Sequence, residues 1–141
     1  MKVAYPVFIK KDGDYDLVYI PDFDGMTEGF GFCDAIEMAR DYIGLNGTAY
    51  YDEGKDYPIP SDEAKARATV KNRGEDEFDF SDGTLTFVDI DFDAYRKKIR
   101  NLSVKKNCTI PQWLAEKAVA ANINFSRVLQ DALIDIVGAD A

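Results

Sequence analysis

The stretch from Ser103 to Ile110 has the sequence Ser-Val-Lys-Lys-Asn-Cys-Thr-Ile and is followed by Pro111. Side chains alternate along it with period two, the pattern of a strand with one buried face. The apolar side carries Cys108 and Ile110, and the polar side consists of Lys105, Asn107 and Thr109. Pro111 cannot donate to a strand ladder and suits the first turn of a helix. The sequence therefore predicts a strand over residues 103–110 that ends where a helix begins.

Two helices are predicted after this strand. The first spans residues 111–121 and ends at Asn122, because Asn tolerates the left-handed backbone of a helix end. The second has Asn124 as a good N-cap and ends at Gly138. Their apolar stripes are Leu114, Ala118 and Ala121 in the first, and Leu129, Ala132, Leu133 and Ile136 in the second. A lone strand with two helices cannot stabilise itself by burial, so we expect two copies to pair strand to strand.

This tail, residues 102–141, resembles the ribbon-helix-helix DNA-binding domain. The matching segments are Asn107 to Pro111, Trp113-Leu114, and Ile123 to Leu133. In that family the strands of a dimer enter the major groove, and the N-terminus of the second helix holds a phosphate. Asn122 departs from the family, which usually has Gly between the helices, and Lys106 falls on the side that should be buried.

The resemblance assigns two sets of DNA-binding residues. The predicted base readers, whose ammonium, amide and hydroxyl groups can bond base edges, are Lys105, Asn107 and Thr109. The predicted phosphate site is Asn124 with Phe125, Ser126 and Arg127, which would offer their backbone amides. The alternative is a helical appendage that only dimerises the protein.

Charge divides the chain into an acidic body and a basic tail. Residues 1–93 hold 22 acidic and 9 basic residues, a net charge of −13, whereas residues 94–141 hold 4 acidic and 8 basic residues, a net charge of +4. The tail can approach phosphates, and the body suits a basic protein. The simpler alternative is that the acidic surface only keeps the protein soluble.

Composition limits the remaining possibilities. The 141 residues suffice for one ordinary domain or two small ones. Cys33 and Cys108 form neither a disulfide framework nor a metal-ligand cluster, and Cys108 is expected to be a small buried hydrophobe. The chain contains no histidine, which excludes Ser-His-Asp and Cys-His catalysis and histidine metal sites. No membrane-spanning run or signal peptide is visible, so we expect a cytoplasmic protein without a membrane partner.

The first 93 residues predict an α+β domain. Its expected strands are residues 3–10, 15–20, 26–31 and 84–92, the first two forming a hairpin. A helix is expected from Phe32 to its closure at Gly44, and a short one from Ser61 to Ala68. Pro6 favours an edge or a bulge in the first strand. Residues 94–101 are expected to be a basic connector.

This half resembles the HicB family of antitoxins. The matching segments, in family order, are Tyr5 to Phe8, Asp16 to Phe23, Thr27 to Gly29, Asp34-Ala35 with the helix through Arg40, Tyr57-Pro58-Ile59-Pro60-Ser61, and Val88 to Phe92 followed by Tyr95. HicB proteins are antitoxins of type II toxin–antitoxin pairs. Their partner, HicA, is a small RNA-cleaving toxin. The resemblance covers nearly all of the chain except residues 62–83.

The resemblance implies a fold and a function. The expected fold is a partial ribonuclease-H-like domain of three to four antiparallel strands plus a helix over residues 1–93, and a ribbon-helix-helix dimerisation domain over residues 102–141. The expected function is an antitoxin that neutralises a HicA-like toxin and binds operator DNA as a homodimer to repress its own operon, without a cofactor. Whether dimers assemble further stays open. The alternative is a stand-alone DNA-binding regulator whose front half senses a ligand or oligomerises.

A ribonuclease-H-like architecture also raises a nuclease hypothesis. Such nucleases gather three or four carboxylates around two divalent ions. The candidates are Asp16, Asp22, Asp24, Asp89, Asp91 and Asp93. The last three alternate with apolar residues, as on any half-exposed strand. We therefore expect a binding protein and not an enzyme.

Overall fold

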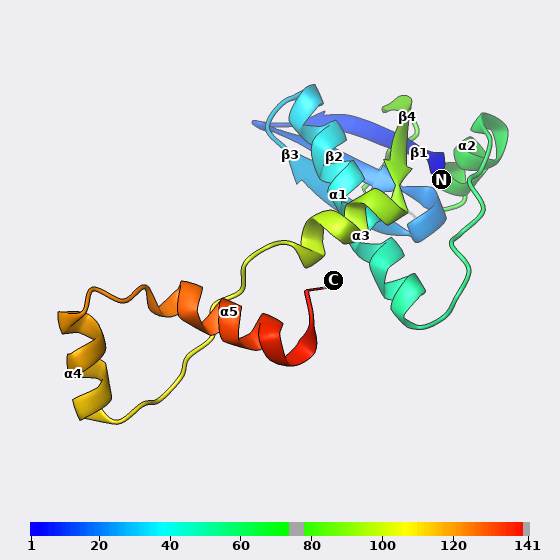
Figure 1. The fold of residues 1–141 in the computed structure, drawn as a ribbon. Coiled ribbons are helices and arrows are strands. Elements are labelled where there is room, and N and C mark those ends of the chain that lie inside the picture. The colour runs from blue at the N-terminus through cyan, green and yellow to red at the C-terminus, as the bar shows by residue number, and fades with distance from the viewer. Residues whose placement is uncertain (74–77, 140–141) are drawn as a thin grey trace. The chain divides into compact units, whose positions relative to one another are not determined.

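The computed structural model describes residues 1–73 and 78–139 of the chain. The chain divides into two compact units, Met1–Ile99 and Arg100–Ala141. The described part of the first unit is an α+β fold with a four-stranded sheet, and that of the second consists of two helices and their connections (Figure 1). No helix in the described ranges combines the length and the apolar character that crossing a membrane requires.

The sheet of the first unit is antiparallel throughout, with strand order β3-β2-β1-β4. Its strands are β1 (Lys2–Asp12), β2 (Tyr15–Ile20), β3 (Gly25–Gly29) and β4 (Thr84–Asp91). The sequence predicted all four, and the β1–β2 hairpin pairs from Phe8 opposite Tyr19 to Asp12 opposite Tyr15. Pro6 lies where β1 is paired with β4 alone, which agrees with the edge position that its missing N–H favours.

Each face of the sheet is covered by a different helix. α1 (Phe32–Asp52) covers the face that carries Tyr5, Val18 and Val88. α2 (Glu63–Lys71) lies with Phe80 over the opposite face, where it covers Phe8 and Tyr19. Alternate residues of the strands thus enter two separate cores, as the period-two pattern requires.

The prediction that the first helix ends at Gly44 is wrong, because α1 continues to Asp52. Gly44 and Gly47 are buried inside α1. A Cβ atom at Gly44 would lie 2.6 Å from the ring of Tyr95, and one at Gly47 would overlap the ring of Phe92. The two glycines therefore permit close packing of aromatic rings against α1 and do not end it.

The prediction of a basic connector over residues 94–101 is also wrong, because α3 spans Phe92–Arg100. Phe92 is buried in the core of the first unit, and Tyr95 packs against it. Arg96 is buried as well and donates to the hydroxyl of Tyr57 at 2.6 Å. The segment is mostly basic in sequence but forms an amphipathic helix that packs on the core. The first unit therefore extends to Ile99.

The second unit contains α4 (Gln112–Ala120) and α5 (Phe125–Val137), close to the predicted helices. Asn122 has the predicted left-handed backbone, with φ of 57°. Around it, the Ile123 amide donates to the Ala118 carbonyl and the Asn122 amide to the Val119 carbonyl, both at 3.0 Å, which forms a Schellman helix end. Gly138 ends α5 as predicted, with φ of 91°.

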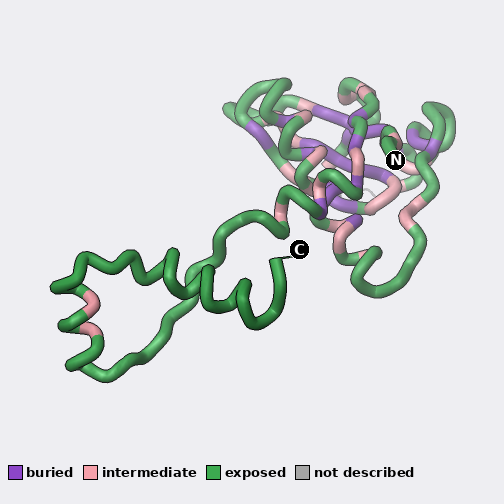
Figure 2. The backbone as a smooth tube through the Cα atoms, viewed as in Figure 1, coloured by how far each residue is buried: buried purple, intermediate pink, exposed green. Residues whose placement is uncertain are grey.

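The predicted strand over residues 103–110 is absent from the single chain, where these residues are neither strand nor helix. A strand exists only through pairing, and no other segment of the described chain pairs with this one. No described residue of the second unit is buried (Figure 2). The expectation that Cys108 is buried is therefore wrong for the single chain, in which its thiol is exposed.

Candidate functional site

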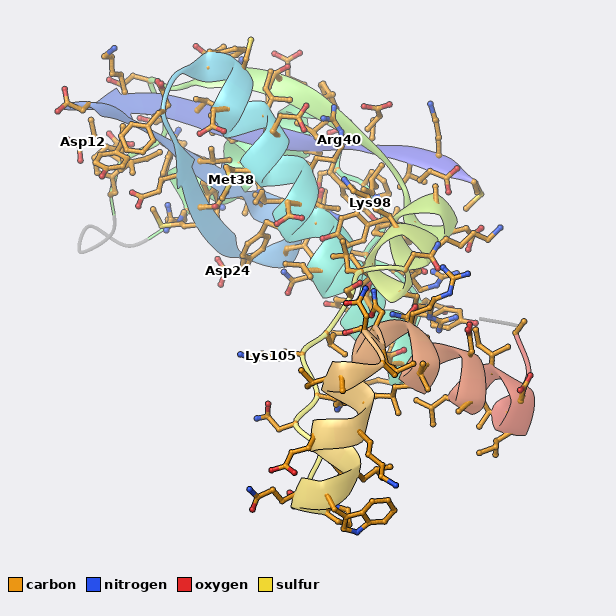
Figure 3. All side chains as sticks on the ribbon, turned by 60° about the vertical axis from the view of Figure 1, so that its left-hand side comes forward. Asp12, Asp24, Met38, Arg40, Lys98 and Lys105 are labelled. Carbon is orange, nitrogen blue, oxygen red and sulfur yellow. The ribbon has the colours of Figure 1, made fainter. Side chains whose placement is uncertain are left out.

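The segment before α4 presents two different sides. A hollow against the start of α5 is lined by Lys106, Cys108, Ile110, Phe125, Ser126 and Leu129. The predicted base readers are not among its lining residues, and all three are exposed; they are Lys105, Asn107 and Thr109. Lys105 extends away from the chain in Figure 3. The predicted alternation thus survives without strand pairing, and Lys106 shares the apolar side, as its position in the sequence indicated.

The start of α5 supplies fewer free amides than predicted. Asn124 caps the helix, because its side-chain oxygen accepts from the amide of Arg127 at 3.0 Å. Arg127 therefore does not offer its amide to a phosphate in this structure, and its guanidinium lies 3.5 Å from the carboxylate of Asp131. The amides of Phe125 and Ser126 belong to the first turn, where an α-helix has no acceptor of its own for them. Of the predicted phosphate contacts, the amides of these two residues are the ones that the helix cap leaves available.

The second unit exposes most of its large apolar side chains. They include the predicted stripe residues Leu114, Leu129, Leu133 and Ile136, together with Val104, Ile110, Trp113, Val119, Ile123, Phe125, Val128, Ile134 and Val137. Among the described residues of this unit, 100–139, none is buried, so the single chain gives this part of the structure no core of its own.

The helices of the first unit differ in charge. α1 contains four acidic residues and one basic residue, Arg40, whereas α3 contains one acidic and four basic residues. Arg40 lies 3.1 Å from the carboxylates of both Glu37 and Asp89, and it also donates to the Asp89 carbonyl. Its hydrogen bond holds the pKa of Asp89 below the usual value. Met38 and Arg40 extend from opposite sides of α1 in Figure 3, and the four acidic residues of the helix, Asp34, Glu37, Asp41 and Asp52, are exposed.

Five of the six carboxylates considered for nuclease chemistry are bound by other groups of the first unit. Asp22 accepts from the amide and hydroxyl of Ser61, and Asp24 accepts from the hydroxyl of Tyr19 at 2.9 Å. Asp91 accepts from the amide of Ala94 at 3.1 Å, which lowers its pKa. Asp89 and Asp93 are bound by Arg40 and Arg96. Within residues 1–73 and 78–139, no three carboxylate or thiol side chains converge in a group that could hold a metal ion.

Sequence reasoning assigned no role to the loop between α1 and α2. It is fastened at Tyr57, Pro58 and Ser61 by partners from three different elements. The only indication in the sequence was the segment Tyr57-Pro58-Ile59-Pro60-Ser61, which entered the family resemblance without a function.

Comparisons with known proteins gave matches among solved structures. A toxin–antitoxin complex from Streptococcus pneumoniae matches with a TM-score of 0.59 and 26% identity, covering 96% of this chain and 99% of that chain. The crystal structure of the antitoxin HicB3 matches with a TM-score of 0.50 and 27% identity, covering 96% and 98%. A complex of HicA3 and HicB3 matches with a TM-score of 0.48 and 29% identity, covering 63% and 99%. No family model matches the sequence, and no curated protein matches it. By the first two of these matches, the chain is similar to the antitoxin HicB3 and to a toxin–antitoxin complex.

Proposed function

We propose that this chain is an antitoxin with two binding surfaces. The first unit binds and neutralises a small, basic, RNA-cleaving toxin of the HicA type. The second unit dimerises as a ribbon-helix-helix domain and binds operator DNA, which represses the operon that encodes the pair. The observation that carries this proposal is the similarity to an antitoxin and to a toxin–antitoxin complex over 96% of the chain.

The charge of the first unit supports the toxin-binding part. A toxin that cleaves RNA needs a basic surface for its polyanionic substrate. The exposed acidic residues of α1 are complementary to such a surface, and covering it would exclude the RNA. No carboxylate has to enter the catalytic centre of the toxin for this inhibition to work. The chain then acts by binding alone, and purified protein with Mg²⁺ should leave labelled RNA intact.

The second unit supports the DNA-binding part. Pairing of residues 103–110 with the same segment of a second copy would form a two-stranded ribbon, which a major groove admits. The exposed side of that ribbon would carry Lys105, Asn107 and Thr109, and the Phe125 and Ser126 amides would meet a phosphate. The same dimer would cover the apolar side chains that a single copy exposes.

A co-expression experiment tests the toxin assignment. The small basic protein encoded beside this chain should stop growth when expressed alone, and co-expression of this chain should restore growth. The purified pair should elute as one complex that no longer cleaves RNA. If the chain neither binds that protein nor relieves its toxicity but still binds DNA upstream of its own gene, it is a stand-alone regulator.

A further inference from the structure

The loop that joins α1 to α2, residues 53–62, is rigidly anchored although it contains no helix or strand. Tyr57 stacks on Phe92 with ring centroids 4.0 Å apart. The carbonyl of Pro58 accepts from the hydroxyl of Tyr5 at 2.6 Å, and the amide of Ser61 donates to the carboxylate of Asp22 at 2.9 Å. Hydrogen bonds therefore hold the backbone at Pro58 and at Ser61, on either side of Ile59 and Pro60.

Those two residues present an apolar side chain to solvent. Ile59 is 85% exposed, the highest value among the large apolar residues of the first unit. It lies between Pro58 and Pro60, and a residue that precedes proline is restricted to extended backbone conformations. The proline rings and the anchors together hold Ile59 in place before any partner arrives. A partner would then lose little conformational entropy on ordering this loop.

The sequence on either side of Ile59 is acidic. Asp52, Glu53 and Asp56 precede it, and Asp62 and Glu63 follow it. The basic residue of this stretch, Lys55, lies 2.6 Å from the carboxylate of Glu53 and is neutralised by it. An exposed apolar side chain within an acidic segment complements an apolar depression surrounded by Lys and Arg side chains. A basic protein offers such a surface, whereas nucleic acid, which is anionic, would be repelled.

We propose that Ile59 is the apolar anchor by which the first unit docks its basic toxin. The Ile59 side chain inserts into an apolar depression of the toxin, and the neighbouring carboxylates pair with basic residues around it. This inference rests on the proposed antitoxin function and assigns the docking surface for it. The rigid loop makes Ile59 a binding hot spot, one of the few interface residues whose truncation weakens binding strongly.

The test compares Ile59→Ala with Met26→Ala in the full chain. Met26 is also an exposed apolar residue of the first unit, 40% exposed. It pairs with Tyr19 on the sheet face that α2 covers, so it lies outside the α1 surface proposed for the toxin and is a matched control. Binding to an inactive form of the co-encoded toxin is measured by titration calorimetry, and melting temperatures are recorded for each variant. Ile59→Ala should bind roughly thirtyfold more weakly, the loss typical of a hot-spot residue. Its melting temperature should match that of the unmodified chain, because the side chain packs against little of its own unit.

Two outcomes would contradict different parts of the proposal. If Ile59→Ala binds the toxin as tightly as the unmodified chain, or loses no more affinity than Met26→Ala, then Ile59 is not the anchor and the antitoxin function stands. If the unmodified chain does not bind the toxin at all, the antitoxin function itself fails.

Discussion

Tyr5 connects the core of the first unit to its anchored loop. Its ring is buried between the sheet and α1, and its hydroxyl donates to the carbonyl of Pro58. Burial, reinforced by the nearby carboxylate of Asp22, raises the pKa of Tyr5 to about 12. The folded unit therefore favours the neutral phenol. The stability that this preference provides is fully present below pH 10, the ordinary pKa of tyrosine, and is lost as the pH rises from 10 through about 12.

Tyr5→Phe should remove this alkaline transition. The variant lacks the hydroxyl, so its free energy of unfolding should fall less steeply above pH 10 than that of the unmodified chain. Urea unfolding between pH 8 and pH 11.5, followed by circular dichroism, measures the difference. Burial also raises the pKa of Tyr95, but this tyrosine is present in both proteins and its contribution cancels. Parallel pH profiles for the two proteins would show that Tyr5 titrates normally.

Asn107 is the residue through which sequence-specific DNA recognition can be tested. A side-chain amide that bonds a base edge typically contributes about 1–3 kcal/mol of discrimination between bases. Asn107→Ala should therefore bind the operator and a point-mutated operator with nearly equal affinity, as should Lys105→Ala and Thr109→Ala at their own positions. Binding titrations at several salt concentrations supply the measurement.

Lys98→Gln is the matched control for the Asn107 experiment. Lys98 is exposed near the end of α3 and is expected to contact phosphates, which carry no sequence information. Its loss should weaken binding to all sequences alike and reduce the salt slope by about one. If Asn107→Ala behaves like Lys98→Gln, or has no effect, the ribbon does not enter the groove.

At the scale of elements, α5 is an amphipathic helix that buries none of its residues in the single chain. Leu133 lies on its apolar stripe and is 49% exposed. Pairing of two copies would place that stripe in a shared core, and the folding of the second unit would then depend on protein concentration. A helix of this length is marginal in water without tertiary packing.

Leu133→Ala should destabilise the dimer of the second unit by about 2–5 kcal/mol, the usual cost of removing a buried leucine side chain. Gln130→Ala, an exposed polar position of the same helix, should change stability little. Thermal unfolding at several protein concentrations tests both, and the melting temperature of the second unit should rise with concentration. A second unit that is well folded as a monomer in sedimentation experiments would rule out the proposed ribbon pairing.

At the scale of the whole molecule, nearly all of the net charge lies in the first unit: residues 1–99 hold 22 acidic and 12 basic residues, a net charge of −10, and residues 100–141 hold 4 acidic and 5 basic residues, a net charge of +1. The boundary between the units falls at the last residue of α3, whose buried Arg96 and packed Tyr95 belong to the core of the first unit. A truncation at residue 93 would remove both side chains and expose Gly44, so functional dissection requires residues 1–99.

Residues 1–99 expressed alone should bind the toxin and protect cells, and should not bind the operator. Opposite charges accelerate association, so the association rate with the toxin should fall as added salt shortens the screening length. Stopped-flow mixing at 50 and 500 mM salt measures this effect, and the full chain provides the reference rate. An association rate that is slow and independent of salt would mean that the acidic surface does not guide binding.

Local patterns in the sequence were sufficient for most strands and for the helix ends of the tail. The alternation in β1, β2 and β4 and the caps at Asn122 and Asn124 depend on residues a few positions apart, whose backbone chemistry acts before any tertiary contact. The alternation of residues 105–110 could also be recognised in the sequence. In the structure, the hollow beside α5 is lined by the predicted apolar residues Cys108 and Ile110 and by none of the predicted base readers. The α+β character of the first unit and the polar side of the tail were therefore determined by the sequence alone.

Only tertiary structure decided the features that depend on distant partners. In the sequence, Gly44 resembles a helix end. The structure places the ring of Tyr95, fifty-one positions later, against it, and this contact is the reason for the glycine. In the sequence, residues 94–100 resemble a connector, and only the burial of Phe92 and Arg96 shows that they belong to a packed helix. The position of Ile59 is fixed because Tyr5 and Asp22 form hydrogen bonds to its loop. The strand over residues 103–110 requires a second chain, because hydrogen bonding between strands is a property of pairs and not of a single segment.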